Sequence, residues 1–385
     1  MRVLFTSTSG WGHIHPMVPL ARAFRDRGDD VLWATGDEVC GRLEREGIAT
    51  SVAGLDDGDA MSMFYERYPD VSAVPPPERS DFMFPRLFGT VRAEAMLADL
   101  VPAARNYAPD LVVCDAAEFA GPIAAAVVSA PNITLSFGAT LPPPRVAATG
   151  VAVEPLWAAH GLDGRPYGGV YDNLYLDIYP PSMQPADRPH IPVVQPLRPG
   201  AFATGEEERL PSWVGEPSSE PLVYVTLGTV FSNNDVLSTV VGALRELPVR
   251  VVVTVGPRGE PDAIGSQPDN VHVARYIPQT QLLEHCSLVV SHAGSGTFLA
   301  ALGAELPQLC LPQAADQFFN AAACVRAGAG IALMPDALSA EAVTDAVGRL
   351  LTDAAYRDAA SRLSREIAAM PSPDEVADKL HANYG

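Results

Sequence analysis

A glycine-rich turn in the second half of the chain holds the residues that best predict a ligand site. The segment 292–297, His-Ala-Gly-Ser-Gly-Thr, follows a short apolar run and precedes a helical pattern. The turn should therefore lie at a helix N-terminus, where backbone N–H groups lack a partner within the helix and suit a phosphate group. The imidazole of His292 and the hydroxyls of Ser295 and Thr297 add donors. Alternatively, the glycines serve only a tight turn.

A carboxylate and an amide follow the next predicted strand. Asp316 and Gln317 come shortly after Gln308–Leu311, and they should therefore lie at the sheet edge where open α/β folds bind ligands. An anion and a polyol would fit there side by side. The dipole of one helix contributes only about 0.3–1 kcal/mol to anion binding, whereas one hydrogen bond to a charged group contributes about 1.5–3 kcal/mol. Several donors must therefore converge on the anion.

A histidine and an aspartate near the start of the chain form a second candidate group. His13 lies in the loop 9–16 after the predicted strand 2–8, and Asp115 ends the predicted strand 109–115. Both should lie at the same edge of one parallel sheet. The carboxylate of Asp115 could instead cap the following helix. The loop is not a dinucleotide-binding fingerprint, because His15 stands where the third glycine of G-x-G-x-x-G is needed.

Alternating strands and helices must position these residues. Two such arrays are separated by a polar passage, and each opens with a strand and a Gly-containing loop. We therefore predict an α/β protein made of two Rossmann-like, doubly wound domains. The predicted domains are 1–205 and 221–371, with a linker at 206–220. The predicted strands are 2–8, 30–34, 48–52, 109–115 and 132–136 in the first array, and 222–227, 249–255, 271–274, 288–290, 308–311 and 331–333 in the second.

Two stretches interrupt the first array. Residues 55–88 look irregular, and their Met and aromatic side chains suit either a pliable wall for a large apolar ligand or a surface lobe with its own small core. Asp57 and Asp59 resemble a metal-binding pair but fit a solvated turn better. Residues 141–179 are poorly periodic and are expected to face a ligand or a partner. The aromatic candidates for the wall are Phe64, Phe82, Phe84 and Phe88.

The composition argues against several classes of function. The formal net charge of -20 opposes attraction to nucleic acid or to an anionic membrane surface. Lys379 is the only lysine, which excludes a Walker-type phosphate loop and a lysine Schiff base near the motifs. The five cysteines are widely spaced and predict buried free thiols in a reducing cytosol. No apolar window suits a membrane span or a signal sequence, and a cytoplasmic protein is therefore expected.

Five motifs together resemble one known family. In their order and spacing they resemble the metal-independent, inverting GT-B glycosyltransferases of family 1, in particular actinomycete enzymes that attach nucleotide-activated sugars to antibiotic aglycones. The resemblance covers nearly the whole chain. It implies that the two domains face each other across a cleft and that the helix 372–385 returns to the N-terminal, acceptor-binding domain. The motifs are Gly12-His13 with Pro16, Val225-Thr226-Leu227-Gly228-Thr229, Tyr276-Ile277-Pro278-Gln279, the turn 292–297, and Pro312-Gln313 with Asp316-Gln317.

The resemblance also implies a role for each matching residue. His13 would be the catalytic base, and Asp115 would be the carboxylate that orients it. Tyr276 replaces the usual tryptophan beside the nucleobase. Ala300 replaces a glutamate that binds ribose hydroxyls in many relatives, which favours thymidine diphosphate (dTDP) over UDP in the donor. The donor-binding positions would be Thr229, Tyr276, Ile277, Gln279, His292, Gly294, Ser295, Gly296, Thr297, Asp316 and Gln317, and the acceptor-binding positions Phe64, Phe82, Phe84 and Phe88.

The implied chemistry needs neither a cofactor nor a metal ion. A neutral imidazole, with a pKa of about 6.5, suits a base that takes the proton of an attacking hydroxyl. The turn at His292 would steady the departing diphosphate. The partners would be a nucleoside diphosphate linked to a deoxy- or aminosugar, and a hydrophobic aglycone; the oligomeric state, with a homodimer as one option, stays open. The alternative functions are a nicotinamide-dependent oxidoreductase, a nucleotide-sugar epimerase, a sugar phosphorylase and a non-catalytic partner of a transferase.

Overall fold

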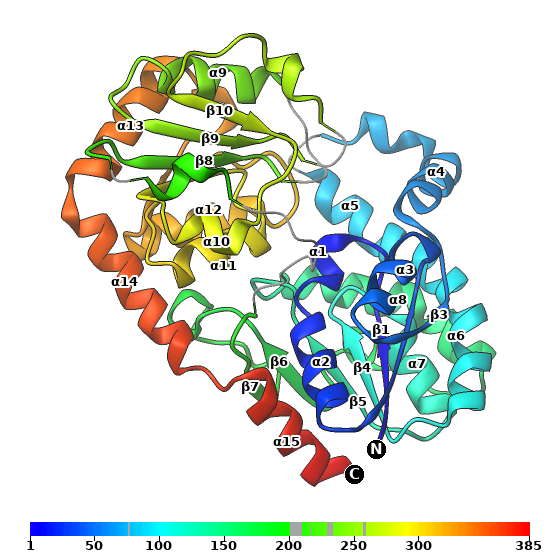
Figure 1. Cartoon of the computed structure of the whole chain (residues 1–385). Coiled ribbons are helices and arrows are strands. Elements are labelled where there is room, and N and C mark those ends of the chain that lie inside the picture. Colours follow the sequence, from blue (N-terminus) through cyan, green and yellow to red (C-terminus); the bar gives the residue numbers. More distant parts are fainter. Residues whose placement is uncertain (76–77, 201–209, 217, 229–233, 257–258) are drawn as a thin grey trace. The chain divides into compact units, whose positions relative to one another are not determined.

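The structure, a computed structural model, describes residues 1–75, 78–200, 210–216, 218–228, 234–256 and 259–385 (Figure 1). The chain divides into two compact units. Unit 1 comprises Met1–Tyr179, Pro185–Phe202 and Met370–Gly385, and unit 2 comprises Pro180–Gln184 and Ala203–Ala369. Residues 206–209 and 217 lie outside the described residues, and the linker at 206–220 therefore stays a prediction.

Unit 1 is built on a seven-stranded parallel sheet with the strand order β3-β2-β1-β4-β5-β6-β7. The order reverses between β1 and β4, which is the point where open α/β sheets bind ligands. All five residues of β4 are buried, as expected for a strand covered on both faces. The strands are β1 Arg2–Thr6, β2 Asp30–Thr35, β3 Ala49–Val52, β4 Leu111–Asp115, β5 Asn132–Leu135, β6 Leu174–Asp177 and β7 Val194–Pro196.

The helices of unit 1 bury their apolar faces on this sheet. The main cluster packs Leu97 and Leu100 of α6 and Ile123 of α7 with Leu4 and Val112 of the central strands. The helices are α1 Trp11–Ile14, α2 Val18–Asp26, α3 Asp37–Arg45, α4 Asp57–Arg67, α5 Arg79–Arg86, α6 Ala93–Tyr107, α7 Ala120–Val127, α8 Pro143–Ala159 and α15 Pro373–Tyr384, with the 3-10 helices η1 Pro69–Ala73 and η4 Pro166–Gly169 and the π-helix η3 Leu87–Arg92.

Unit 2 has a six-stranded parallel sheet with the order β10-β9-β8-β11-β12-β13. Here the order reverses between β8 and β11, whose carboxyl ends lead to Gly228 and His292. The strands are β8 Leu222–Thr226, β9 Arg250–Thr254, β10 Val271–Ala274, β11 Leu288–Ser291, β12 Gln308–Cys310 and β13 Gly330–Ala332. The α-helices are α9 Asn234–Leu244, α10 Gln279–Leu283, α11 Ser295–Gly303, α12 Gln317–Ala327, α13 Ala340–Thr352 and α14 Ala354–Ala369, and the 3-10 helices are η5 Pro181–Met183, η6 Ser212–Gly215, η7 Pro261–Ile264 and η8 Pro335–Ala337.

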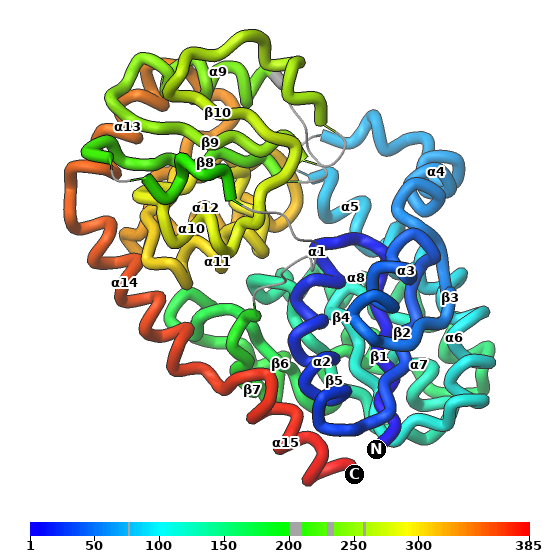
Figure 2. The backbone as a smooth tube through the Cα atoms, in the orientation of Figure 1, coloured from blue at the N-terminus to red at the C-terminus, as the bar shows by residue number. Residues whose placement is uncertain are grey.

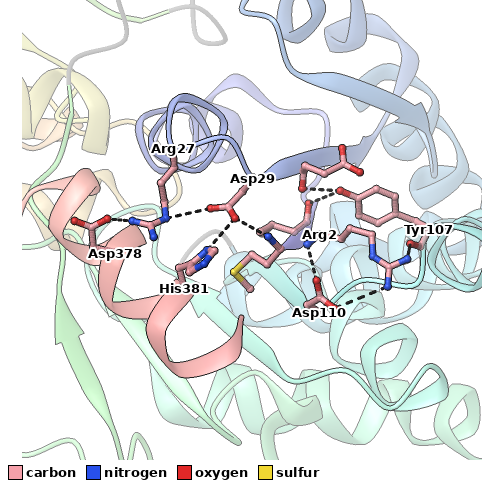
Figure 3. Close-up of polar contacts among 10 residues, drawn as sticks. Arg2, Arg27, Asp29, Tyr107, Asp110, Asp378 and His381 are labelled. Carbon is pink, nitrogen blue, oxygen red and sulfur yellow. Dashed lines mark hydrogen bonds and ion pairs between the residues drawn. The ribbon is translucent and has the colours of Figure 1, made fainter.

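The last helix of the chain packs on the first part of unit 1. Figure 2 shows α15 beside α2, and the two helices are in contact. Ser372 caps α15 in a capping box with Glu375, as its sequence indicates. Asp29, just before β2, lies 2.9 Å from His381 Nδ1 through its Oδ1 atom (Figure 3). Arg27 lies between Asp29 and Asp378 and forms an ion pair with each.

Three local sequence predictions are wrong. The stretch 55–88 is largely helical instead of irregular. It contains α4, the 3-10 helix η1 and α5. Asp57 begins α4 and does not lie in a solvated turn. The stretch 141–179 contains the 17-residue helix α8, which starts at Pro143, since proline suits the first helical turn.

Other expectations agree with the structure. The stretch 55–88 does hold a small core, made by its residues Ala60, Phe64, Val71 and Leu87 together with Val91, which follows the stretch. The five cysteines are free and buried. Within the described ranges, no helix combines the length and the apolar character that crossing a membrane requires.

Candidate active site

His13 and Asp115 meet at the carboxyl edge of the unit 1 sheet. His13 lies in the short helix α1 after β1, Asp115 ends β4, and β1 and β4 are neighbouring strands. His13 Nδ1 lies 2.9 Å from Asp115 Oδ2. The side chain of Asp115 is 1% exposed and that of His13 is 20% exposed. The carboxylate is therefore held away from water, and the other face of the imidazole can reach a ligand.

The surroundings of His13 act on its pKa in opposite directions. Burial lowers the pKa, but the charge of Asp115 and its hydrogen bond to the imidazole outweigh burial, and the net pKa of His13 is raised above 6.5. The more distant charges of Arg92 and Asp57 lower and raise this pKa, respectively. Asp115 therefore favours the imidazolium, which is the form that a general base reaches after taking a proton.

Aromatic side chains line the space beside His13. The ring centroids of Phe137 and Phe88 lie 4.6 Å and 5.9 Å from that of His13, and Phe84 lies 4.5 Å from Phe88. Phe88 belongs to the π-helix η3, an irregularity that is frequent at functional sites. Phe137 is a wall residue that the sequence prediction missed, although it follows the predicted strand 132–136 directly.

The other two aromatic candidates have different surroundings. Phe64 is completely buried in the small core of the stretch 55–88 and has no surface to offer a ligand. Phe82 is partly buried beside the same core, and the guanidinium of Arg86 lies 3.8 Å from its ring centroid. The structure therefore brings Phe84 and Phe88 toward His13 and gives Phe64 a packing role.

Glu118, which the sequence prediction missed, caps the helix after β4. Its carboxylate accepts hydrogen bonds from the N–H groups of Ala120 at 2.6 Å and Gly121 at 2.8 Å, and from the hydroxyl of Thr6. This is the capping role that Asp115 could have filled, and Asp115 pairs with His13 instead. Burial raises the pKa of Glu118 to about 7, against the opposing effect of these hydrogen bonds. The sequence signal that could have identified Glu118 is the position of a carboxylate just before the first turn of a helix.

The glycine-rich turn of unit 2 has the predicted place at a helix N-terminus. β11 ends at Ser291, Gly294 is the N-cap of α11, and α11 begins at Ser295. The ring of His292 fills the space that side chains at Gly228 and Gly294 would need. A Cβ atom there would lie 2.6 Å and 2.3 Å from atoms of the imidazole. The ring therefore requires glycine at both positions, and the positive φ of Gly228 is a second reason for glycine at that position.

His292 is held as a neutral imidazole at neutral pH. Burial lowers its pKa, and the charge of Asp316 opposes the effect only in part. A neutral imidazole can donate one hydrogen bond to a ligand oxygen. Gly296 is exposed and Thr297 is partly buried at the start of α11, where backbone N–H groups lack helical partners. The turn therefore has the donors that an anion needs.

Polar side chains after β12 fix the loop next to this turn. Asp316 Oδ2 accepts hydrogen bonds from Ser295 Oγ at 2.6 Å and Asn320 Nδ2 at 3.0 Å. Asn320 is completely buried and also donates to the carbonyl of Ala293 at 2.9 Å. The sequence prediction missed Asn320, although it lies one helical turn after Asp316. These bonds connect α12 to the turn and hold both in one arrangement.

The amide oxygen of Gln317 is bound within the protein, and its expected contact with a sugar stays a prediction. Its Oε1 atom accepts from the N–H groups of Gln313 at 2.7 Å and Ala314 at 2.9 Å. The residue is only 3% exposed. The structure thus uses the amide of Gln317 to shape the loop 313–316.

The remaining donor candidates lie around α10. Tyr276 is 37% exposed and Ile277 is 4% exposed within a core cluster. Gln279 Nε2 donates to Thr297 Oγ1 at 3.1 Å and connects α10 to α11. Thr229 lies outside the described residues. In the part of the chain that the structure describes, no group of three or more His, Cys, Asp or Glu side chains could hold a metal ion.

Family models match both halves of the chain. The model of the erythromycin biosynthesis protein CIII-like N-terminal domain matches residues 22–197, and that of the C-terminal domain matches residues 238–383. The aclacinomycin-T 2-deoxy-L-fucose transferase of Streptomyces galilaeus is 30% identical, with 100% of this chain and 97% of the relative covered. The L-demethylnoviosyl transferase of Streptomyces niveus is 31% identical, with 99% of this chain and 98% of the relative covered.

Solved structures agree with these matches. The spinosyn rhamnosyltransferase SpnG has a TM-score of 0.85 at 27% identity, with 99% of this chain and 100% of that chain covered. Structures of SpnG complexed with thymidine diphosphate and with the spinosyn aglycone are similar to this chain as well. The predicted fold class and the predicted family are confirmed. The chain belongs to the erythromycin biosynthesis protein CIII-like family and is a family 1 GT-B glycosyltransferase.

Proposed function

We propose that this glycosyltransferase moves a deoxy- or aminosugar from dTDP to a hydroxyl of a hydrophobic aglycone, with inversion at the anomeric carbon. The contact of 2.9 Å between His13 and Asp115, beside Phe88 and Phe137, is the observation that carries the proposal. Two relatives are named as transferases of 2-deoxy-L-fucose and of L-demethylnoviose. The SpnG complexes, with thymidine diphosphate and with an aglycone, support the same two substrate classes.

The reaction is a direct displacement. His13 Nε2 takes the proton of the acceptor hydroxyl while the hydroxyl oxygen forms a bond to the anomeric carbon. The bond between that carbon and the diphosphate oxygen breaks, and the diphosphate leaves with the electron pair. Attack from the face opposite the leaving group inverts the anomeric configuration. Asp115 accepts the Nδ1–H hydrogen bond, keeps Nε2 free to accept the proton, and stabilises the imidazolium.

The turn at the start of α11 would bind the departing diphosphate. The free N–H groups of the first helical turn and the neutral imidazole of His292 supply donors, and their combined hydrogen bonds contribute more than the helix dipole alone. Asp316 uses Oδ2 for Ser295 and Asn320, which leaves Oδ1 for a sugar hydroxyl. We assign no metal ion and no cofactor to this step.

Product analysis tests the proposal. The full chain is incubated with a panel of dTDP-sugars and a small aglycone library, with and without a chelator, and products are identified by mass spectrometry and by the anomeric coupling in NMR spectra. We expect dTDP and an inverted glycoside to form together, only when an acceptor is present, and equally with the chelator. Release of dTDP without an acceptor, interconversion of the donor sugar, or retention of configuration would contradict the proposal.

A further inference from the structure

A small cavity in unit 1 lies next to the dyad of His13 and Asp115. Phe88 is common to both, because it lines the cavity and its ring lies 5.9 Å from that of His13. An aglycone held beside His13 by Phe88 would therefore extend toward this cavity. The cavity is mixed in character, with apolar walls and a few polar side chains among its lining residues Ser7, Phe88, Arg92, Met96, Glu118 and Phe119.

Most of the polar atoms of the cavity are already used. Ser7 Oγ accepts a hydrogen bond from Trp33 Nε1 at 2.9 Å. The carboxylate of Glu118 is occupied by Ala120, Gly121 and Thr6. Arg92 is different, because its Nε atom is buried and has no hydrogen-bond partner. Among the described residues that line the cavity, this is the one buried side-chain polar atom in that condition.

Arg92 is fixed in place by its other contacts. The residue is 8% exposed, its Nη2 atom donates to Asp57 Oδ1 at 2.5 Å, and its guanidinium lies 5.6 Å from the ring centroid of Phe88. A rigid buried donor without a partner costs free energy in the empty protein. A ligand oxygen that accepts from Nε recovers that cost on binding, and a ligand without the oxygen does not.

The charges around Arg92 determine which kind of ligand oxygen can bind to its Nε–H group. Asp57 neutralises the guanidinium, Glu118 lines the same cavity, and the chain has a formal net charge of -20. A carboxylate or phosphate on the ligand would therefore meet repulsion, whereas a neutral carbonyl would not.

We infer that Arg92 determines acceptor specificity by donating a hydrogen bond from Nε to a neutral carbonyl oxygen on the ring system of the aglycone. This inference rests on the proposed function, since it concerns the acceptor of that reaction. It narrows the acceptor class to fused-ring or macrocyclic compounds with a ketone, quinone or ester carbonyl near the hydroxyl that receives the sugar.

Binding of two probe compounds tests the inference. The probes are 2-hydroxyanthraquinone and 2-hydroxyanthracene, which share one ring frame and differ in the two carbonyl groups. Equilibrium dialysis without a donor, at a pH below the pKa of both phenols, gives their affinities for the wild type. We expect the wild type to prefer the quinone by about tenfold to a hundredfold, as expected for one hydrogen bond to a charged group.

Two variants assign the preference to Arg92. Arg92→Lys keeps the positive charge beside Asp57 but removes the Nε–H donor, and it should bind the two probes within about twofold of each other. Arg92→Met, which has a side chain of similar length without a donor, should do the same and serves if Arg92→Lys does not fold. Arg67→Lys is the matched control, because Arg67 forms a 2.9 Å ion pair with Glu94 away from the cavity. This control should keep the wild-type preference.

Three outcomes would overturn the inference. They are equal affinity of the wild type for the two probes, no measurable binding of either probe, and a quinone preference that persists in both Arg92 variants. Failure of the proposed function is seen in a different experiment. In that case the same preparation does not release dTDP when an acceptor is added. If Arg92 had only a structural role, its substitution would lower the stability of the protein and would weaken the binding of both probes by the same factor.

Discussion

At the scale of single residues, the environment of His13 decides how it can act. Burial lowers the pKa of the imidazole, and the charge of Asp115 together with its hydrogen bond to the ring raises the pKa by more. Both effects suit the proposed general base, which must be neutral before the reaction and positively charged after it. The neighbouring rings of Phe88 and Phe137 limit access of water while leaving the His13 side chain 20% exposed.

The pH dependence of the reaction follows from the direction of this pKa shift. Protonated His13 cannot accept a proton, and we expect kcat/KM to rise with pH and to level off above a midpoint higher than the ordinary histidine value of about 6.5. Asp115→Asn removes the charge that raises the pKa, and burial then moves the midpoint below that value. Initial rates between pH 5 and pH 9, measured for both proteins, check the shift. Coincident midpoints would show that Asp115 does not act on the base.

Ala300 carries a prediction about the donor. The family resemblance implies that Ala300 replaces a ribose-binding glutamate, and its methyl side chain has no group that could bind a 2′-hydroxyl. We expect kcat/KM for a dTDP-linked sugar to exceed that for the UDP-linked form of the same sugar. Ala300→Glu should reduce this difference. A clear preference of the wild type for the UDP-linked sugar would contradict this prediction.

At the scale of elements, the regular strands and the glycine-rich turn could be predicted from sequence. Apolar runs that end in Gly or in a polar residue predicted β1, β4, β8 and β11 correctly. The prediction failed where prolines and aromatic residues stand close together. Pro142, Pro143 and Pro144 look like a loop, but α8 begins there because a proline fits the first turn of a helix.

Only part of the candidate site could be predicted from the sequence. The candidate residues at the ends of strands could be found, since the carboxyl ends of parallel strands share one edge of the sheet. Residues that act through contacts distant in sequence could not. Glu118 contacts Thr6 across two strands, and the ring of His292 packs on Gly228. No periodicity in the sequence records such contacts.

Glu118 makes the stability of α7 depend on pH. Its pKa in the folded protein is about 7, above the ordinary value of 4.5. A raised pKa means that the favourable contribution of this group is present below pH 4.5 and is lost as the pH rises through about 7. Glu118→Gln keeps one acceptor oxygen, which serves one of the two N–H groups, and it does not titrate. Its free energy of unfolding should therefore rise relative to the wild type between these pH values, by up to about 3 kcal/mol.

Urea unfolding at several pH values measures this difference, with fluorescence of the tryptophans in unit 1. Glu94→Gln is the control, because Glu94 is 60% exposed in the helix next to α7. The control should follow the wild type at every pH. Parallel curves for Glu118→Gln and the wild type would contradict the assigned role of the buried carboxylate.

At the scale of the whole molecule, unit 1 is assembled from segments that are far apart in the sequence. α15 contacts α2, and Asp29 contacts His381 across 352 positions (Figure 3). The side chain of Asp29 is 3% exposed, whereas that of Asp378, which also pairs with Arg27, is 68% exposed. Removing one partner of a buried ion pair costs more than removing one partner of an exposed pair, because the remaining buried charge is left without compensation while water solvates an exposed one.

The two aspartates give a matched pair of tests for the attachment of α15. Asp29→Ala should weaken this attachment by about 1–3 kcal/mol, since it removes the acceptor for His381 and a partner of Arg27. Hydrogen exchange of the α15 amides should then be about tenfold to a hundredfold faster. Asp378→Ala should change exchange little. Equal effects of the two substitutions would argue against Asp29 as the main contact.

Turnover of the His13→Ala variant shows whether His13 takes the proton of the acceptor hydroxyl. With a dTDP-sugar and an accepted aglycone, kcat should fall about 10²- to 10⁴-fold, while the dissociation constant of dTDP, measured by calorimetry, should stay within about twofold of the wild-type value. Near wild-type turnover by His13→Ala would show that His13 is not the base.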